Sequence, residues 1–184
     1  ESAYYLGVNR NKRSMTLNMA MKSGQEVLAG LIRKSDVLVE NFKVGTLEKW
    51  GFSNDWLQAN APRVVRCSIT GYGSVGPKAG LPGYDFILQA ESGLMGITGE
   101  PGGTPMKYGV AIVDICTGML ACNTILAALN ARHITGRGQH VVEVVGQREW
   151  IDGTDDRGAR EVWRHLREVA QDADRDAFDH RVGR

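Results

Sequence analysis

The chain has 184 residues, of which 42% are hydrophobic, and a formal net charge of +1 at pH 7. This length and apolar content suit one domain, or part of a larger one, and the small net charge gives no indication of nucleic-acid or membrane binding. The longest apolar stretches, such as residues 125–129, fall far short of the ~20 residues of a membrane span, and no charged-then-apolar leader opens the chain. We therefore expect a soluble intracellular protein.

The N-terminal part of the chain predicts a strand and then a helix. Residues 14–19 alternate between polar and apolar side chains, as in a short strand. Ser23 is a candidate N-cap for a helix whose apolar residues recur at helical spacing. The apolar face of that helix consists of Val27, Leu28, Leu31 and Ile32.

A pattern of alternating strands and helices continues from there. We predict a buried strand at residues 36–42, short helices at 46–50 and 54–59, and another strand at 63–70. Strands and helices joined by short links predict an α/β fold with a parallel sheet. Ligands of such sheets bind beyond the carboxyl ends of the strands. The residues at those ends are Asn41, Phe42, Thr70, Gly71 and Tyr72.

The segment GYGSVG, residues 71–76, matches the dinucleotide-binding fingerprint literally. That fingerprint requires its third glycine to lie in the first turn of a helix whose N-terminus holds a pyrophosphate. Two prolines and two glycines within residues 77–83 instead predict a loop. We therefore expect no nicotinamide or flavin site, but a mobile glycine-rich loop that could form part of another binding site.

A long, mostly buried helix is predicted at residues 115–133, followed by a turn at 135–138 and a strand at 140–145. Asp114 lies between two apolar residues where this helix should begin. A buried carboxylate costs several kcal/mol unless it has partners, so Asp114 needs a structural partner or a chemical role. It could be an ordinary N-cap, a nucleophile, or both.

Several segments together resemble consecutive blocks of the class III coenzyme A transferases. This family includes formyl-CoA transferase, carnitine CoA-transferase and alpha-methylacyl-CoA racemase. The resemblance runs in unbroken order from about Tyr4 to Val145, although family members are much longer, so the chain looks like a fragment. The blocks read NRNKRSMTLNM, SDVLVENFKVGTLEKWGF, PRVVRCSITGYGSVGP, GYDFILQAESGLMGITG, GVAIVDICTGM and TGRGQHVVEV.

The resemblance implies that residues 1–145 are part of a large, Rossmann-like domain that binds CoA, and that two full-length chains interlock as a homodimer. It places Asp114 on the family's catalytic aspartate. That carboxylate attacks an acyl-CoA to form a mixed anhydride and then an aspartyl thioester, from which a small carboxylic acid takes the CoA. CoA thioester would be a substrate, and no permanently bound cofactor is expected. The cellular location would be the cytoplasm, or the mitochondrion or peroxisome of a eukaryote.

Further binding residues follow from the resemblance. Asn41 and Phe42 match the family's pair at the CoA pocket, although a strand terminus with a buried aromatic is an equal alternative. Leu17 matches a position that contacts the adenine. Basic residues of formyl-CoA transferase are missing at Ala20 and changed at Lys49, so the cations that hold the CoA phosphates are not identified.

Tyr84 and Asp85 match positions that contact the acceptor in transferases. The racemase branch has a catalytic histidine where this chain has Tyr84, and a phenol, which ionises only near pH ~10, is a poor replacement. A packed core tyrosine is the structural alternative. The segments GYD and SGLMGITG resemble in sequence those of the branch that moves CoA between succinate and other dicarboxylates.

Residues 146–184 depart from the family pattern. They contain eight arginines, no lysine and few large apolar residues, a bias that a shifted reading frame in a GC-rich gene would give. We expect this segment, including a weak amphipathic helix at 161–170, to pack loosely or be disordered. A truncated, inactive chain that at most binds CoA or a partner is therefore a third hypothesis, beside transferase and racemase.

The remaining candidate ligands predict no metal site and no disulfide. The four histidines are scattered along the chain. The three cysteines, Cys67, Cys116 and Cys122, lie in apolar segments without metal-ligand spacing, so we expect reduced structural thiols.

Overall fold

The computed structural model describes residues 2–145. The predicted tail at 146–184, with its weak helix, lies outside the described residues, so the predicted domain boundary stays a prediction. The described elements are α1 (Ala3–Val8), α2 (Lys22–Arg33), β1 (Val37–Glu40), α3 (Thr46–Lys49), α4 (Asn54–Asn60), β2 (Val65–Thr70), α5 (Asp85–Glu91), the 3₁₀ helix η1 (Leu94–Ile97), α6 (Ile112–Thr135) and β3 (His140–Val144).

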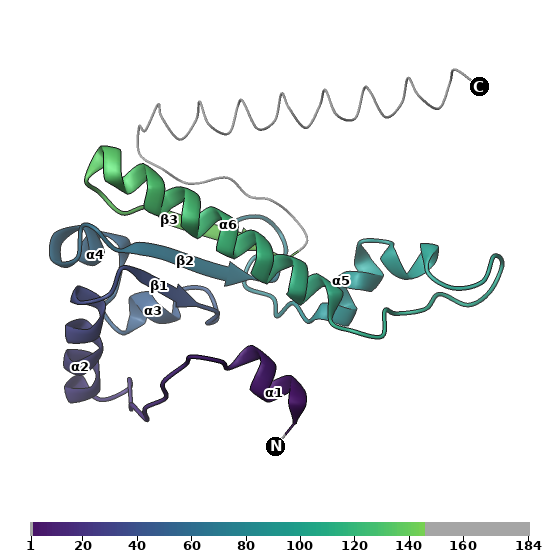
Figure 1. Ribbon diagram of the computed structural model, residues 1–184, viewed down its shortest axis with the longest axis horizontal. Helices are drawn as coiled ribbons and strands as arrows, with labels where there is room; N and C mark the ends of the chain where they lie inside the picture. The colour runs from purple at the N-terminus through teal and green to yellow at the C-terminus, as the bar shows by residue number, and fades with distance from the viewer. Residues whose placement is uncertain (1, 146–184) are drawn as a thin grey trace.

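A three-stranded parallel sheet forms the centre of the fold, in the order β1-β2-β3 (Figure 1). Val37 of β1 pairs with Val65 of β2, and Arg66 of β2 pairs with His140 of β3. All three strands therefore end at the same edge. The predicted α/β fold, a parallel sheet with flanking helices, is confirmed.

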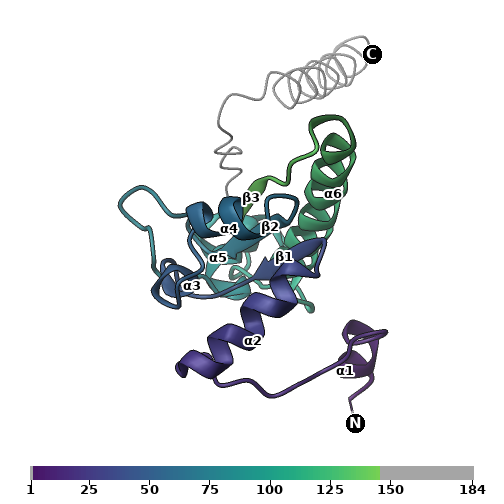
Figure 2. The ribbon, with the colours of Figure 1, turned by 90° about the vertical axis from the view of Figure 1, so that its left-hand side faces the viewer.

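The two faces of the sheet are covered by different helices (Figures 1 and 2). Alternate residues of β2 point to opposite faces, so Val65 and Cys67 pack with Ala121 and Ala128 of α6. On the other face, α2, α3 and α4 share a cluster that consists of Ile32, Leu47, Phe52, Leu57 and Ala61. These two cores hold the sheet between helices.

The segment from β2 to α6 extends from the carboxyl edge of the sheet (Figure 1). It begins with a glycine-rich loop, continues through α5 and η1, and returns to the start of α6. The residues that follow the GYGSVG segment form a loop, since the next helix, α5, starts only at Asp85. The prediction that a loop follows this segment is confirmed.

Two predictions about the N-terminal segment are wrong. Residues 14–19 form no strand, because they lie outside the sheet and have no ladder partner among residues 2–145. Helix α2 begins at Lys22 with Met21 as its N-cap, which places Ser23 inside the first turn. The backbone packs so closely there that a Cβ at Gly24 would lie 2.0 Å from the carbonyl oxygen of Asn18.

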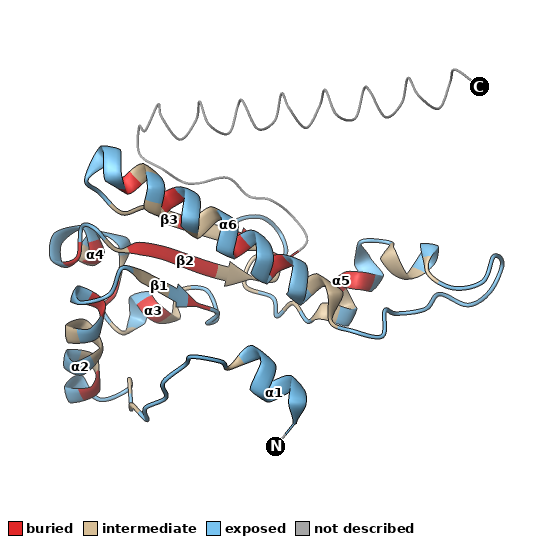
Figure 3. Cartoon of the chain, viewed as in Figure 1, coloured by how far each residue is buried: buried red, intermediate tan, exposed pale blue. Residues whose placement is uncertain are grey.

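Helix α6 has an exposed apolar face, which Figure 3 shows in pale blue along much of its length. Met119, Leu126 and Ile134 are all exposed. By length and composition alone, α6 could span a membrane, so the expectation that no apolar segment is long enough was wrong. Its other face packs on the sheet, and its Arg132 forms an ion pair with Asp36 at 2.9 Å. The described part of the chain thus buries one face of α6 on the sheet and leaves the other face exposed.

Candidate active site at the strand ends and the start of helix α6

The first turn of α6 is capped by a side chain from another helix. The Oδ1 atom of Asp85, at the start of α5, accepts hydrogen bonds from the backbone N–H groups of Val113 at 2.8 Å and Asp114 at 3.3 Å. The amides of a first helical turn have no partner within the helix and attract negative charge. Asp85 therefore supplies the cap, through a long-range contact that no local sequence pattern indicates.

Asp114 lies in the first turn of α6, not at its N-cap, which is Ala111. The prediction that Asp114 caps the helix is wrong, as is the expectation that it is buried, because its side chain is exposed. Within residues 2–145 its carboxylate has no hydrogen-bond or ion-pair partner. Asp114 thus has no structural role in this part of the chain that would occupy its oxygens.

The surroundings of Asp114 disfavour its charge. Partial burial, and then the negative charge of Asp85, raise the pKa of the Asp114 carboxyl above its ordinary value. A helix N-terminus favours an ionised carboxylate, but Asp85 already accepts hydrogen bonds from the amides of Val113 and Asp114 there. A carboxylate with a raised pKa is less well stabilised in its charged form and is a stronger base and nucleophile.

A cavity of about 370 Å³ lies at the carboxyl ends of β1 and β2. Asn41, Phe42 and Tyr84 line it, so the structure brings three of the predicted site residues together. Asn41 donates from Nδ2 to the carbonyl oxygen of Ile69 at 2.9 Å and so ties the two strand ends together. We call this hollow the strand-end cavity; that it binds a ligand stays a prediction.

The aromatic residues of this cavity are held differently. Phe42 packs edge-on against Trp50 with ring centroids 5.2 Å apart. Tyr84 is 60% exposed and stacks with Phe86 at 6.5 Å. The alternative of a packed core tyrosine is therefore wrong, and the Tyr84 hydroxyl is accessible to a ligand.

The glycine-rich loop, residues 71–83, is closed at its neck by two glycines in contact. A Cβ placed on Gly71 would lie 2.5 Å from the Cα and the backbone nitrogen of Gly83. No side chain fits in that space, so glycine is required at Gly71 by the close approach of the two backbones. The contact fixes both ends of the loop beside the strand-end cavity.

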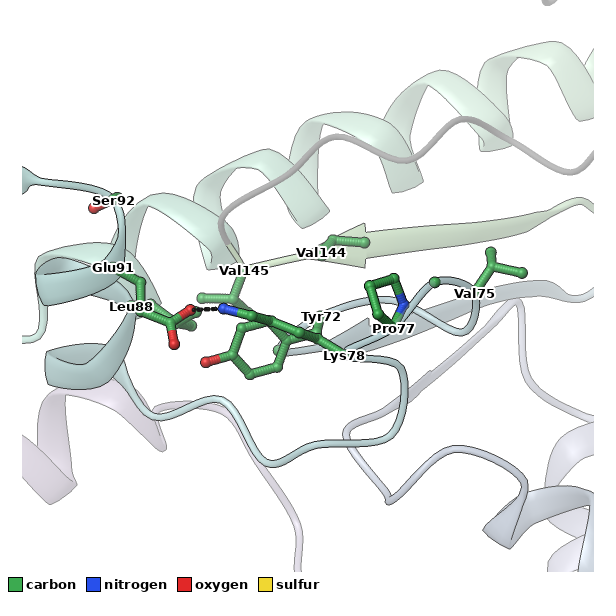
Figure 4. Close-up of a pocket in the computed structure, with 11 residues that line it drawn as sticks. Tyr72, Val75, Pro77, Lys78, Leu88, Glu91, Ser92, Val144 and Val145 are labelled. Carbon is green, nitrogen blue, oxygen red and sulfur yellow. Dashed lines mark hydrogen bonds and ion pairs between the residues drawn. The ribbon is translucent and has the colours of Figure 1, made fainter.

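A second cavity, of about 530 Å³, lies on the other side of this loop (Figure 4). Figure 4 shows the Lys78 ammonium pointing to Glu91 of α5. The two atoms are 2.8 Å apart, and the ammonium lies over the Tyr72 ring, 5.3 Å from its centroid. Both partners of the ion pair are largely exposed, so it contributes little stability. It connects the loop to α5.

A buried polar cluster lies beneath the strand ends, on the face opposite α6. Arg66 of β2 bonds Glu40 at 3.0 Å and Glu48 at 2.8 Å. Ser68 bonds both Glu40 and His140. Burial alone would raise the pKa of Glu48, but hydrogen bonds from Arg66 and its own backbone, with the charge of Arg66, hold it below its usual value. The cluster links β1, β2 and β3 through side chains on this face of the sheet.

Other predicted site residues lie apart from these features. Leu17 is half-buried in the extended segment before α2 and does not line the strand-end cavity. Asp85 and Asp114 do not line it either. Among residues 2–145, no group of three or more acidic, histidine or cysteine side chains could hold a metal ion.

The chain was then compared with known proteins. The sequence model of CoA-transferase family III matches residues 1–147. The succinate–glutarate CoA-transferase of Agrobacterium fabrum is 45% identical over 140 residues, which are 76% of this chain and 35% of that protein. The formyl-CoA:oxalate CoA-transferase of Streptomyces avermitilis is 45% identical over 141 residues, which are 77% of this chain and 34% of that protein.

Solved structures agree with these sequence matches. A CAIB/BAIF family protein from Brucella suis superimposes with a TM-score of 0.75 at 43% sequence identity, covering 79% of this chain and 38% of that one. The chain thus spans about a third of the length of its curated relatives (35% and 34% for the two above).

Proposed function

The chain belongs to CoA-transferase family III, and we propose that the complete protein moves coenzyme A from an acyl-CoA donor to a small carboxylic acid. Relatives named for succinate, glutarate and oxalate support an acceptor that is a dicarboxylate. The GYD and SGLMGITG segments, which contain Tyr84 and the 3₁₀ helix η1, support the succinate-type branch.

The state of Asp114 carries this proposal. A side-chain carboxylate in the first turn of a helix is usually explained by capping, but here Asp85 provides the cap. Asp114 remains exposed, with no partner for its oxygens among residues 2–145 and with a raised pKa. These are the properties that a carboxylate nucleophile needs.

The reaction would proceed through covalent steps on Asp114. Its carboxylate attacks the thioester carbonyl, the carbon–sulfur bond breaks, and CoA leaves as a thiolate, which gives a mixed anhydride. The thiolate then attacks the aspartyl carbonyl, and the donor acid leaves as a carboxylate. The acceptor carboxylate attacks the aspartyl thioester, the carbon–sulfur bond breaks and the CoA thiolate leaves, which gives a second anhydride. The thiolate then attacks the acceptor carbonyl of this anhydride, and Asp114 leaves as a free carboxylate.

Binding of the substrates would use the strand-end cavity and its rim. We propose that Asn41 and Phe42 contact CoA, because they line the cavity and their positions are fixed by Ile69 and Trp50. Leu17 would contact the adenine. Tyr84 would donate its hydroxyl to the acceptor, since its side chain is exposed.

Asp85 has a different position in the site. Both of its carboxylate oxygens already accept hydrogen bonds, Oδ1 from the α6 amides and Oδ2 from Gln89. A carboxylate also repels an acceptor that is itself an anion. Asp85 would therefore act at the acceptor site mainly by fixing and tuning Asp114.

We also propose that the complete protein is an intracellular homodimer. The exposed apolar face of α6, with Met119 and Leu126, supports burial against further protein. Cys67, Cys116 and Cys122 are all unpaired, and the last two are exposed, which supports a reducing compartment.

A direct assay tests the proposal. Purified complete gene product should transfer CoA from succinyl-CoA to glutarate or oxalate, and Asp114→Asn should abolish transfer while CoA affinity changes by less than about threefold. No transfer to any small carboxylate, or near-normal transfer by Asp114→Asn, would contradict it. Deuterium uptake at the α-carbon of a 2-methylacyl-CoA would instead identify a racemase, which the tyrosine at position 84 disfavours.

A further inference from the structure

Gln89 is a buried polar residue whose hydrogen bonds lead to the start of α6. It lies on α5 and is only 1% exposed. Its Nε2 atom donates to Oδ2 of Asp85, and its Oε1 atom accepts from the backbone N–H of Tyr108 at 2.9 Å. Burying an amide side chain is costly unless its hydrogen bonds are made. A glutamine at this position therefore has a specific task that an apolar residue of the same size would not perform.

One bond of Gln89 stays within α5, to Asp85 one turn earlier, and the other connects α5 to the backbone 19 residues further along the chain. Tyr108 belongs to the stretch that leads into α6, and Asp85 begins α5. Asp85 is held at both oxygens, by Gln89 on one side and by the amides of Val113 and Asp114 on the other. A chain of hydrogen bonds thus runs from Gln89 through Asp85 to the backbone of Asp114.

We infer that Gln89 is a positioning residue for the proposed transfer reaction. By donating to Asp85 and accepting from Tyr108, it fixes the first turn of α6 and so the direction in which the Asp114 carboxylate points. The inference rests on the proposed function. Gln89 does not line the strand-end cavity, so it acts on the reaction through Asp85 and the backbone of Tyr108.

The effect of losing Gln89 should appear in turnover and not in binding. A displacement of ~1 Å in a reacting group can cost about 100-fold in rate. In Gln89→Met, which keeps the side-chain volume but neither hydrogen bond, we expect kcat to fall about 10- to 100-fold. The KM for acyl-CoA should stay within about twofold, because the cavity residues Asn41 and Phe42 are held by other contacts.

The pH profile gives a second readout that a purely structural role would not move. Among the described residues, Asp85 is the charged group that raises the pKa of Asp114, after partial burial. An Asp85 released from Gln89 can turn away from Asp114. The acidic limb of kcat/KM should then shift to lower pH in Gln89→Met.

The experiment uses the complete gene product in three forms besides the wild type. Gln89→Met removes both hydrogen bonds, and Gln89→Glu keeps an acceptor for Tyr108 but loses the donor to Asp85. Thr124→Val is the matched control: it removes a hydrogen bond from the same helix α6 to Glu143, at 2.6 Å, away from the site. Each is measured by kinetics and by hydrogen exchange of the Val113 and Asp114 amides.

The inference is supported if the amide hydrogens of Val113 and Asp114 exchange at least tenfold faster in both Gln89 variants and if kcat falls in both. In Thr124→Val, neither the exchange rate nor kcat should change by more than about twofold. The inference is overturned if the amide exchange rates and kcat of Gln89→Met equal those of the control, or if only KM changes in this variant. Full activity of Gln89→Glu would also overturn it. The exchange measurement needs no activity. If the wild type transferred no CoA, the proposed function would fail while the link from Gln89 to the α6 amides would still be tested.

Discussion

Replacing Asp85 by alanine should destabilise the start of α6 and leave a second residue without its partner. The substitution removes the acceptor for the amides of Val113 and Asp114. It also removes the acceptor for Nε2 of Gln89, a residue that is only 1% exposed. The perturbation therefore combines the loss of a helix cap with a buried, unsatisfied donor.

The expected magnitude follows from these two losses. Loss of a helix N-cap costs about 1–2 kcal/mol, and a buried donor left unsatisfied costs about 1–3 kcal/mol. Both groups can relax in part, so we expect Asp85→Ala to lower the free energy of unfolding by about 2–4 kcal/mol. This is a large fraction of the stability of an ordinary domain.

Denaturant unfolding followed by tryptophan fluorescence measures this, since Trp50 and Trp56 pack in the core formed by α2, α3 and α4. Asp55→Ala is the control, because Asp55 is also an acidic residue in the first turn of a helix, α4, whose cap is instead Ser53. The control should lose no more than about 0.5 kcal/mol. An Asp85→Ala protein as stable as this control would refute the assignment of the cap.

The same variant has a pH consequence with a definite sign. Asp114 has a raised pKa in the folded state, so the folded protein binds its proton more tightly than the unfolded chain does. The free energy of unfolding therefore falls as pH rises through the window between the unfolded-state pKa and the folded-state pKa of Asp114. Below this window Asp114 is protonated in both states and its titration costs no stability. Removing the charge of Asp85 should shrink the window and move the acidic limb of activity to lower pH.

Three further outcomes are expected. Gly71→Ala should force the new Cβ against the backbone of Gly83, lower the melting temperature by an amount equivalent to about 1–3 kcal/mol, and weaken CoA binding. An unchanged melting curve would contradict the contact between Gly71 and Gly83. Arg66→Met should leave Glu40 buried without its partner and cost about 3–5 kcal/mol in urea unfolding, so a loss below about 1 kcal/mol would contradict the buried pair. Burial, and then nearby carboxylates, raise the pKa of Cys67 to about 11, so iodoacetamide at pH 8 should modify it only after unfolding, as peptide mass spectrometry would show.

The sheet could be predicted from the sequence because its signals are local. Residues 36–42 and 63–70 are apolar runs of strand length between short helical segments, and the structure has β1 and β2 within them. The segment 14–19 alternates between polar and apolar residues, which also suits a strand, but it has no neighbouring strand within the described residues. Alternation shows which residues suit a pleated surface, whereas a strand also requires a partner.

The site was predictable in position but not in its internal contacts. The rule that ligands bind at the ends of parallel strands led to Asn41 and Phe42, and these do line a cavity. The cap from Asp85 joins positions that are 28 and 29 residues apart, and no local pattern marks such a pair. The burial of Gln89 could not be predicted either, because a glutamine on a short helix usually faces solvent.

The measurement that tests the central claim most directly is the identification of the acylated residue. The complete gene product is mixed with succinyl-CoA, quenched with hydroxylamine and digested, and the peptide that contains VDICTGM is analysed by mass spectrometry. The account predicts a hydroxamate on Asp114, and none on Asp85, whose oxygens are occupied by the α6 amides and Gln89. A hydroxamate on any other residue, with Asp114 unmodified, would contradict it.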